Sequence, residues 1–383
     1  MALAPNGTAA VAWVDQARKS VLFQRISPQG QPQLPAPVDV SRQPATFSWL
    51  PRVALAPDAP QLVYVLWQEI IFSGGSHGGE IMLARSLDGG ASFGPAVNLS
   101  GGSRAGDGKG RLTTGVWDNG SLDLLAAPDG QVFAAWTEYE GAVWLTPRAD
   151  SGARFSAPRR LAGGEGARAA RAPALALAPD GSVFLAWSDG EAPGADIRLA
   201  RAGAGTARFG PARMAVGGPA YDDAPRLAVD RDGVLHLAYA QRTPGSFAPA
   251  EVRYRRSFDA GHSFEPPRVL SRPLPRARPA AGYPQLGLDA RGHVLACWEL
   301  FEDAAGARPR GLGYALSGDS GQRFGQALRV PGSQDPQGGL NGSSQGLLAR
   351  KLSVNEAGDV ALATSALRQG SHSRVWLLRA RLG

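Results

Sequence analysis

Three cationic side chains stand at matching positions of a segment that repeats along the chain: Arg52, Arg226 and Lys351. If they converge, they could bind the carboxylate of an acidic ligand, and arginine does so through a bidentate fork that lysine lacks. The competing interpretation is that they are ordinary charges at the ends of strands. Tyr221 precedes Arg226 closely and is a candidate nucleophile or ligand-stacking residue, although the sequence assigns it no activating glutamate.

A second set of candidates is a carboxylate that follows the aromatic residue of a repeat: Glu69, Glu138, Asp189 and Glu299. Carboxylates at one repeated position could bind cations, amines or sugar hydroxyls. They could also pair with arginines of neighbouring repeats, which we favour because repeated positions often serve contacts between repeats.

Two tryptophans, Trp49 and Trp117, are expected in loops, where they could stack on a sugar or simply pack against the protein. The five histidines show no metal-ligand spacing, and Cys297 lies in an apolar run. No phosphate-cradling loop or nucleophile elbow is present. The sequence therefore predicts no metal and no cofactor.

Composition narrows the class of protein. The 383 residues include 50 glycines and 30 prolines, too many for a helical protein and typical of short strands joined by turns. The net charge of +7 comes from scattered arginines without interleaved aromatics, so we expect no nucleic-acid partner. No apolar run approaches the roughly 20 residues that span a bilayer, so we expect no membrane span.

Internal repetition is the most informative feature of the chain. A unit of the form Pro-x-Leu-Ala-x-x-Pro-Asp-Gly-x-Val-x-x-Ala-Trp recurs seven times, and each unit has the size of a four-stranded propeller blade. The pattern predicts an all-β chain: one β-propeller domain over residues 1–383, seven-bladed, with six blades as the alternative. The predicted repeats span about 2–41, 51–100, 122–164, 173–218, 225–271, 284–333 and 350–383.

A turn motif is expected between the third and fourth strands of three repeats. Its aspartate would cap backbone amides, its glycine would adopt a conformation that other residues resist, and its aromatic ring would anchor the turn to the sheet. The motif is structural and consists of Ser86, Asp88, Gly90 and Phe93; of Ser257, Asp259, Gly261 and Phe264; and of Ser317, Asp319, Gly321 and Phe324.

This motif resembles the Asp-box of the sialidase-like (BNR-repeat) β-propellers. The resemblance implies that these turns share one face and that a ligand binds the opposite face, on loops between the second and third strands and between successive blades. Sialidases of this kind use three arginines, a tyrosine nucleophile with a glutamate, and an aspartate acid/base. They usually have six blades, whereas this chain has seven copies.

We therefore expect a non-catalytic or uncharacterised sialidase-like binding module that presents a funnel face to a glycan, peptide or protein partner. The alternative is an exo-sialidase-type glycoside hydrolase. We expect a monomer that is periplasmic or secreted, because Met1 stands directly against a repeat, as if a signal peptide had been removed.

Overall fold

The computed structural model describes all residues except 16, 43–46, 71–78, 101–111, 114–115, 118–121, 129, 139–140, 149–154, 165, 192, 243–249, 273–279, 302–308, 337–339, 342–349 and 368–373. For residues 47, 70, 79, 112, 113, 116, 117, 148, 340, 341 and 367 only the backbone is described. The chain divides into two compact units, Met1–Leu175 with Gly205–Ala207, and Ala176–Ala204 with Arg208–Gly383. Each unit is described by itself.

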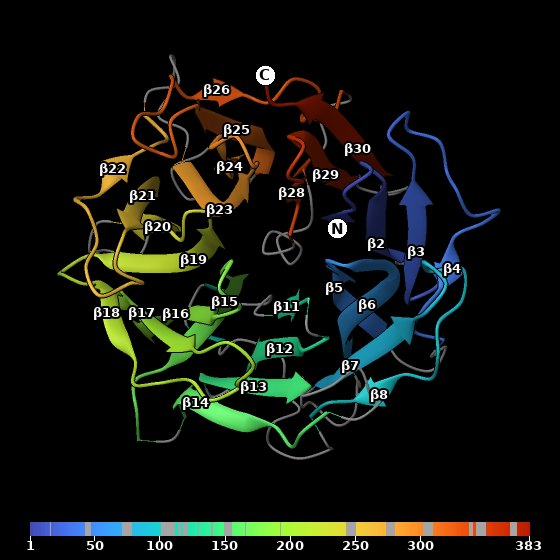
Figure 1. The fold of residues 1–383 in the computed structure, drawn as a ribbon, viewed down its shortest axis with the longest axis horizontal. Helices are drawn as coiled ribbons and strands as arrows, with labels where there is room; N and C mark the ends of the chain where they lie inside the picture. The colour runs from blue at the N-terminus through green and yellow to red at the C-terminus, as the bar shows by residue number, and fades with distance from the viewer. Residues whose placement is uncertain are drawn as a thin grey trace. The chain divides into compact units, whose positions relative to one another are not determined.

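The first unit contains three four-stranded antiparallel sheets, each an up-and-down meander (Figure 1). A two-stranded hairpin and the start of β15 (Ala170–Leu177) complete this unit. The sheets are β1 (Ala2–Leu3), β2 (Ala9–Asp15), β3 (Ser20–Ile26) and β4 (Val38–Asp39); β5 (Phe47–Ala56), β6 (Ala59–Ile70), β7 (Gly79–Ser86) and β8 (Val97–Asn98); and β11 (Asp123–Ala126), β12 (Val132–Thr137), β13 (Ala142–Arg148) and β14 (Arg159–Gly163). The hairpin pairs β9 (Leu112–Thr113) with β10 (Val116–Trp117).

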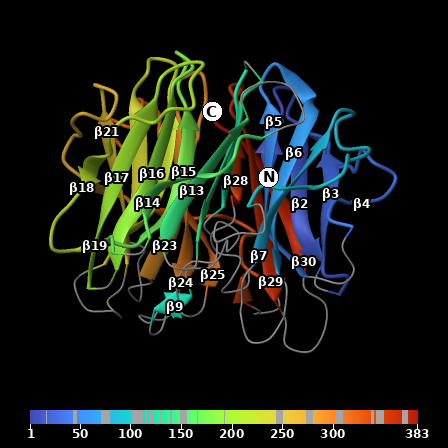
Figure 2. The same cartoon turned by 90° about the horizontal axis from the view of Figure 1, so that it is seen from below.

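The second unit continues the same pattern, and Figure 2 shows two of its long strands, β16 and β17, running side by side. In the last sheet β27 and β28 pair with one edge of β29, and β30 pairs with the other. Its strands are β16 (Val183–Glu191), β17 (Gly194–Ala202), β18 (Arg213–Val216), β19 (Tyr221–Val229), β20 (Leu235–Arg242), β21 (Glu251–Ser257), β22 (Arg268–Val269), β23 (Ala280–Leu288), β24 (Val294–Phe301), β25 (Pro309–Ser317), β26 (Leu328–Arg329), β27 (Leu340–Asn341), β28 (Leu352–Val354), β29 (Asp359–Leu367) and β30 (Arg374–Arg381).

The predicted all-β fold of four-stranded β-propeller blades is confirmed, but the predicted number of blades, seven or alternatively six, is wrong. Among the described residues, five four-stranded sheets stand separately. The fourth and fifth repeats instead share one eight-stranded sheet, because β17 and β19 pair in parallel at Ala195 and Tyr221. The short strand β18 ends its pairing at Ile197, so the edge of β17 beyond it is open to β19.

The first strand of most repeats starts three to four residues earlier than predicted, because it continues through a bulge. The bulges in β5, β19 and β23 fall around Leu50, Ala224 and Tyr283, each of which precedes a proline. These three residues have φ angles of 52°, 50° and 52°, in the left-handed region. Such a conformation is costly for a residue with a Cβ atom, so its recurrence indicates a structural requirement of the blade.

The cores lie between successive sheets of each unit, and the second strand of a sheet is covered on both faces. Every residue of β12 and of β24 is buried. The aromatic residues that mark the repeats, among them Trp67, Trp136 and Trp298, are fully buried. Each such ring removes about 150–250 Å² from water, which makes these residues the main anchors of blade packing.

The three predicted turns share one pattern of hydrogen bonds. In the first, the Ser86 hydroxyl donates to Asp88 Oδ1 at 2.7 Å and accepts from the amide of Gly90 at 2.7 Å. Asp88 also accepts from the Ser92 hydroxyl at 2.6 Å and from the Ser92 amide at 2.9 Å, and these bonds, the hydroxyl's first, lower its pKa to about 2. The bonds of the first serine and of the backbone amides recur at Ser257, Asp259, Gly261 and Ser263, and at Ser317, Asp319, Gly321 and Arg323.

The glycine of each turn is required for two reasons. Gly90, Gly261 and Gly321 have φ angles of 89°, 82° and 76°, which favour glycine. A Cβ atom there would also collide with a side chain of the third strand of the preceding repeat, namely Phe23, Leu199 or Tyr254. The turn therefore packs against the neighbouring blade as well as its own sheet, and Phe324 meets the Tyr254 ring edge-on at 4.8 Å.

Candidate functional site

Two of the three predicted cations, Arg52 and Lys351, contact a neighbouring repeat. Arg52 is 1% exposed, and its Nε donates to the carbonyl oxygen of Leu122 at 2.8 Å, in the next repeat. At the same repeat position Asp123 accepts from the backbone amide of Leu175 at 2.7 Å. The side chains at this position therefore link inner strands, a use that repeat position alone could not distinguish from ligand binding.

The two other predicted cations lie in the second unit. Lys351 forms a buried ion pair with Glu299, a predicted ligand-face carboxylate of the preceding repeat. Burial raises the pKa of Glu299, and the Lys351 ammonium partly opposes that shift. Arg226 is buried and donates from Nη1 to the carbonyl oxygen of Pro225 at 3.1 Å. Glu299 thus pairs with a cation of a neighbouring repeat, and this cation is a lysine where we expected an arginine.

The three remaining carboxylates of the predicted row are also engaged within the protein. Glu69 accepts from the Ser48 hydroxyl at 2.9 Å and from the Trp67 indole at 2.7 Å. Glu138 accepts from the indole of Trp144 at 2.7 Å. Asp189 forms an ion pair with Arg198 at 3.0 Å. Indole and hydroxyl partners were not foreseen, because the sequence does not reveal which side chains face each other across a sheet.

Of the two tryptophan candidates, Trp49 packs in the core, and only the backbone of Trp117 is described. Trp49 is 9% exposed and packs in the hydrophobic cluster that includes Leu66 and Trp136, so it serves the core. Trp117 lies in β10, and its side chain falls outside the described residues.

Tyr221 begins β19 and remains partly exposed, with the Arg242 guanidinium 5.9 Å from its ring centroid. Asp223 is also partly exposed and accepts from the Ser188 hydroxyl at 2.8 Å. Because side chains alternate along a strand, Tyr221 and Asp223 share one face of β19 and the residue between them faces the other way.

That intervening residue, Asp222, is the functional candidate that the sequence reasoning missed. It is 1% exposed, and Oδ1 accepts from Gln241 Nε2 at 2.7 Å, while Oδ2 has no partner among the described residues. Burial raises its pKa to about 6 against the opposing effects of Gln241 and Arg253, with Asp196 adding to the rise. The sequence offered no signal for it, because the extension of β19 to Tyr221 and the exposure of the residues on either side of Asp222 are known only from the structure.

The described side chains do not favour metal binding or catalysis by a thiol. No group of three or more His, Cys, Asp or Glu residues in the described parts of the chain could hold a metal ion. Burial raises the pKa of the Cys297 thiol strongly, so this thiol is a poor nucleophile. No helix long and apolar enough to cross a membrane occurs in the described ranges.

Comparison with known proteins shows the fold. No family model and no curated protein sequence matches the chain. A polysaccharide lyase, an ulvan lyase bound to -[GlcA(1-4)Rha3S]-, is similar with 12% identity and a TM-score of 0.61 over 98% of this chain and 90% of that one. The α-L-arabinofuranosidase of Fusarium graminearum is similar with 13% identity and a TM-score of 0.58 over 89% of this chain and 94% of that one. A Hadza microbial sialidase is similar with 14% identity and a TM-score of 0.52 over 95% of this chain and 73% of that one. The chain therefore has the β-propeller fold that these glycan-processing enzymes share.

Proposed function

We propose that this chain is a non-catalytic, glycan-binding β-propeller module of the sialidase-like type, acting in the periplasm or outside the cell. The observation that carries the proposal is the Tyr221 surface, formed by Tyr221, Asp223 and Arg242 on one face of the sheet, with Asp222 and its partner Gln241 on the opposite face. A partly exposed tyrosine offers an apolar face on which a sugar ring can stack. The carboxylate of Asp223 and the guanidinium of Arg242 beside it supply an acceptor and donors for sugar hydroxyls.

Two further points support a binding module over an exo-sialidase. A carboxylate clamp of the sialidase type needs cations that are available to the ligand, whereas Arg52 bonds to a backbone carbonyl and Lys351 to Glu299. The solved structures of similar fold are a polysaccharide lyase, a sialidase and an arabinofuranosidase. Their shared use of glycans makes a glycan the first ligand class to test, ahead of a peptide or protein partner.

The proposal is tested by screening the purified chain against an array of neutral, acidic and amino-sugar glycans, followed by calorimetric titration of any hit. We expect Tyr221→Ala to weaken binding about tenfold or more, as loss of a central aromatic contact does. Tyr314→Ala is the control, because Tyr314 is a partly buried tyrosine in β25. Equal affinities of wild type and Tyr221→Ala for every hit, or no hit at all, would refute the proposal.

Exo-sialidase-type hydrolysis is the second candidate, because one observation favours it. The pKa of Asp222, raised to about 6 by burial, lies in the range that suits a general acid at neutral pH. Hydrolysis of a fluorogenic sialoside by wild type, abolished in Asp222→Asn, would establish catalysis. Turnover that persists unchanged in Asp222→Asn would exclude Asp222 as the acid.

A further inference from the structure

A small pocket in the first unit contains hydrogen-bond donors and no counter-ion. It has a volume of about 220 Å³, and its lining combines four polar residues, Asn6, Thr8, Arg25 and Gln61, with Gly89 and the apolar residues Ala4, Ala10, Leu55, Pro60 and Val63. This is several times the roughly 30 Å³ that one water takes in the liquid, and it is smaller than the usual site for a drug-sized ligand. No Asp or Glu of the described chain lines it.

Arg25 belongs to a set of arginines that occupy one position in the third strand of several repeats. The register places Arg25 opposite Ala10, Arg85 opposite Tyr64, Arg201 opposite Phe184 and Arg256 opposite His236, each one residue beyond the first pair between the second and third strands. Because the position is the same, the surroundings of these arginines can be compared directly. A difference between their partners is therefore particular to one repeat and is not required by the fold.

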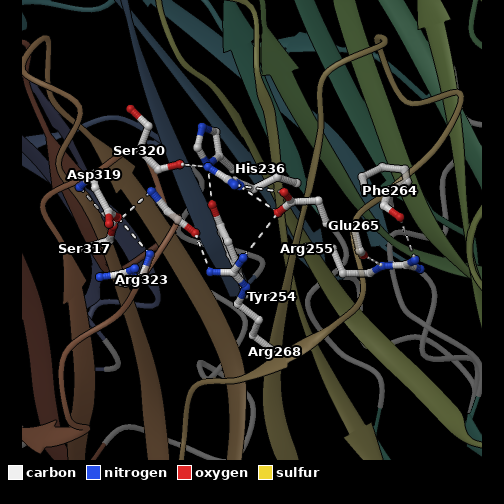
Figure 3. A network of polar contacts seen from close by, with 12 residues as sticks. His236, Tyr254, Arg255, Phe264, Glu265, Arg268, Ser317, Asp319, Ser320 and Arg323 are labelled. Carbon is white, nitrogen blue, oxygen red and sulfur yellow. Dashed lines mark hydrogen bonds and ion pairs between the residues drawn. The ribbon is translucent and has the colours of Figure 1, made fainter.

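Two of the other three arginines, Arg201 and Arg256, are neutralised by an acidic side chain. Arg201 pairs with Asp180 at 2.7 Å and also donates to the Ser182 hydroxyl at 2.7 Å. Arg256 makes two 3.0 Å hydrogen bonds to the carboxylate of Glu265 and a third, at 2.8 Å, to the carbonyl oxygen of Ser320 in the next turn; Figure 3 shows Glu265 and Ser320 in this network. An acidic side chain therefore accompanies each of these two guanidinium groups.

Arg25 occupies the same position in its strand, but no acidic side chain accompanies its guanidinium among the residues that line the pocket. Its guanidinium lies against Gly89, which holds the place in its turn that Ser320 holds beside Arg256. Within the described residues the Arg25 guanidinium makes no hydrogen bond or ion pair. The side-chain amide of Gln61 is exposed and equally without a partner there, and Asn6 uses only its Oδ1, which accepts from the amide of Thr8 at 3.0 Å. The donors of three side chains thus remain available in one small pocket.

We propose that this pocket binds the sulfate group of a small sulfated ligand or of inorganic sulfate. A guanidinium presents two parallel N–H groups that match two oxygens of such an anion, and charge-assisted bonds of this kind are the strong ones. The amides of Asn6 and Gln61 and the hydroxyl of Thr8 can donate to the remaining oxygens. The site is independent of the Tyr221 surface, because its residues belong to the first unit.

The test is a calorimetric titration of the full chain with sodium sulfate, against sodium chloride at equal ionic strength. We expect a saturable sulfate isotherm that Arg25→Gln weakens at least about tenfold. Arg201→Gln is the matched control, because it removes an arginine at the same repeat position that already has its acid. Thermal unfolding of each variant shows that it remains folded.

A second variant supplies the missing acid. Gln61→Glu places a carboxylate in the pocket beside Arg25, much as Glu265 accompanies Arg256, and should abolish sulfate binding without removing any cation. A sulfated monosaccharide titrated in parallel identifies the source: tighter binding than inorganic sulfate assigns the pocket to sulfated glycans, and equal binding assigns it to the free anion. No saturable sulfate binding by wild type, or equal binding by wild type and Arg25→Gln, overturns the proposal.

Discussion

Replacing Gly321 by alanine measures how tightly a turn is packed against the preceding blade. Gly321 has a φ of 76°, and a Cβ atom there would overlap the hydroxyl of Tyr254. That hydroxyl is buried and lies 2.5 Å from His236 Nδ1, so it cannot move without breaking this contact. Figure 3 shows the two side chains pointing toward each other. The left-handed conformation costs alanine about 1–2 kcal/mol, and overpacking adds about 1–3 kcal/mol. The expected loss of unfolding free energy is therefore about 2–5 kcal/mol.

Gly233→Ala is a matched control, because Gly233 has a φ of 81° and open space where its Cβ would be placed. It should lose only the conformational part, about 1–2 kcal/mol. Urea unfolding followed by tryptophan fluorescence gives both values from the midpoint and slope. The difference between the two variants isolates the packing cost at Tyr254.

A double variant tests the cause directly. Tyr254→Phe removes the hydroxyl that the new methyl group would meet, so Gly321→Ala should cost less in that background than in wild type. A positive coupling energy of about 0.5–3 kcal/mol is expected for side chains in contact. If Gly321→Ala and Gly233→Ala cost the same, or if the coupling is zero, the turn is not held against Tyr254 as described.

Three other predictions concern charged groups. Lys351→Met should cost about 3–5 kcal/mol in urea unfolding by leaving Glu299 buried and unpaired, and Glu299→Leu in that background should restore most of it; no restoration would contradict the pairing. Because burial raises the pKa of Asp222 to about 6, the folded protein retains a proton that the unfolded chain releases near pH 4. Stability should therefore fall as pH rises from 4 to 6, by up to about 3 kcal/mol, and Asp222→Asn should flatten this part of the profile; an unchanged profile would refute the assignment. Ser263→Ala should raise the pKa of Asp259, because the Ser263 hydroxyl is the largest cause of its lowering; carbon NMR titration of the carboxyl measures the shift, and a constant value would contradict this.

Local features were largely predictable from the sequence. The turns at Ser86, Ser257 and Ser317 form the hydrogen bonds that their residue types predicted, since every partner lies within a few residues along the chain. The all-β class and the order of strands within a repeat were also predictable, because they depend on residues close together along the chain. The bulge before Pro51 was not predicted, because a left-handed Leu50 runs against local preference and is imposed by the sheet.

Contacts between blades were not predictable in detail. Arg52 and Lys351 occupy one repeat position, yet one bonds to a backbone carbonyl and the other to a glutamate. Asp222 looked like an unremarkable neighbour of Tyr221 until its burial and its Gln241 contact were known. Such differences depend on which side chains the adjacent sheet supplies, and these come from residues far away in the sequence.

The sequence by itself determined the repeating unit, the all-β class and the chemistry of the turns, because these depend on residues close together in the chain. Only the tertiary structure decided that the fourth and fifth repeats share one sheet, through a single pairing of Ala195 with Tyr221. It also decided that Arg256 is neutralised by Glu265 while Arg25 is not. The physical reason is that a charged group's role is set by the groups packed around it, and a repeated position specifies its place in the strand without specifying its neighbours.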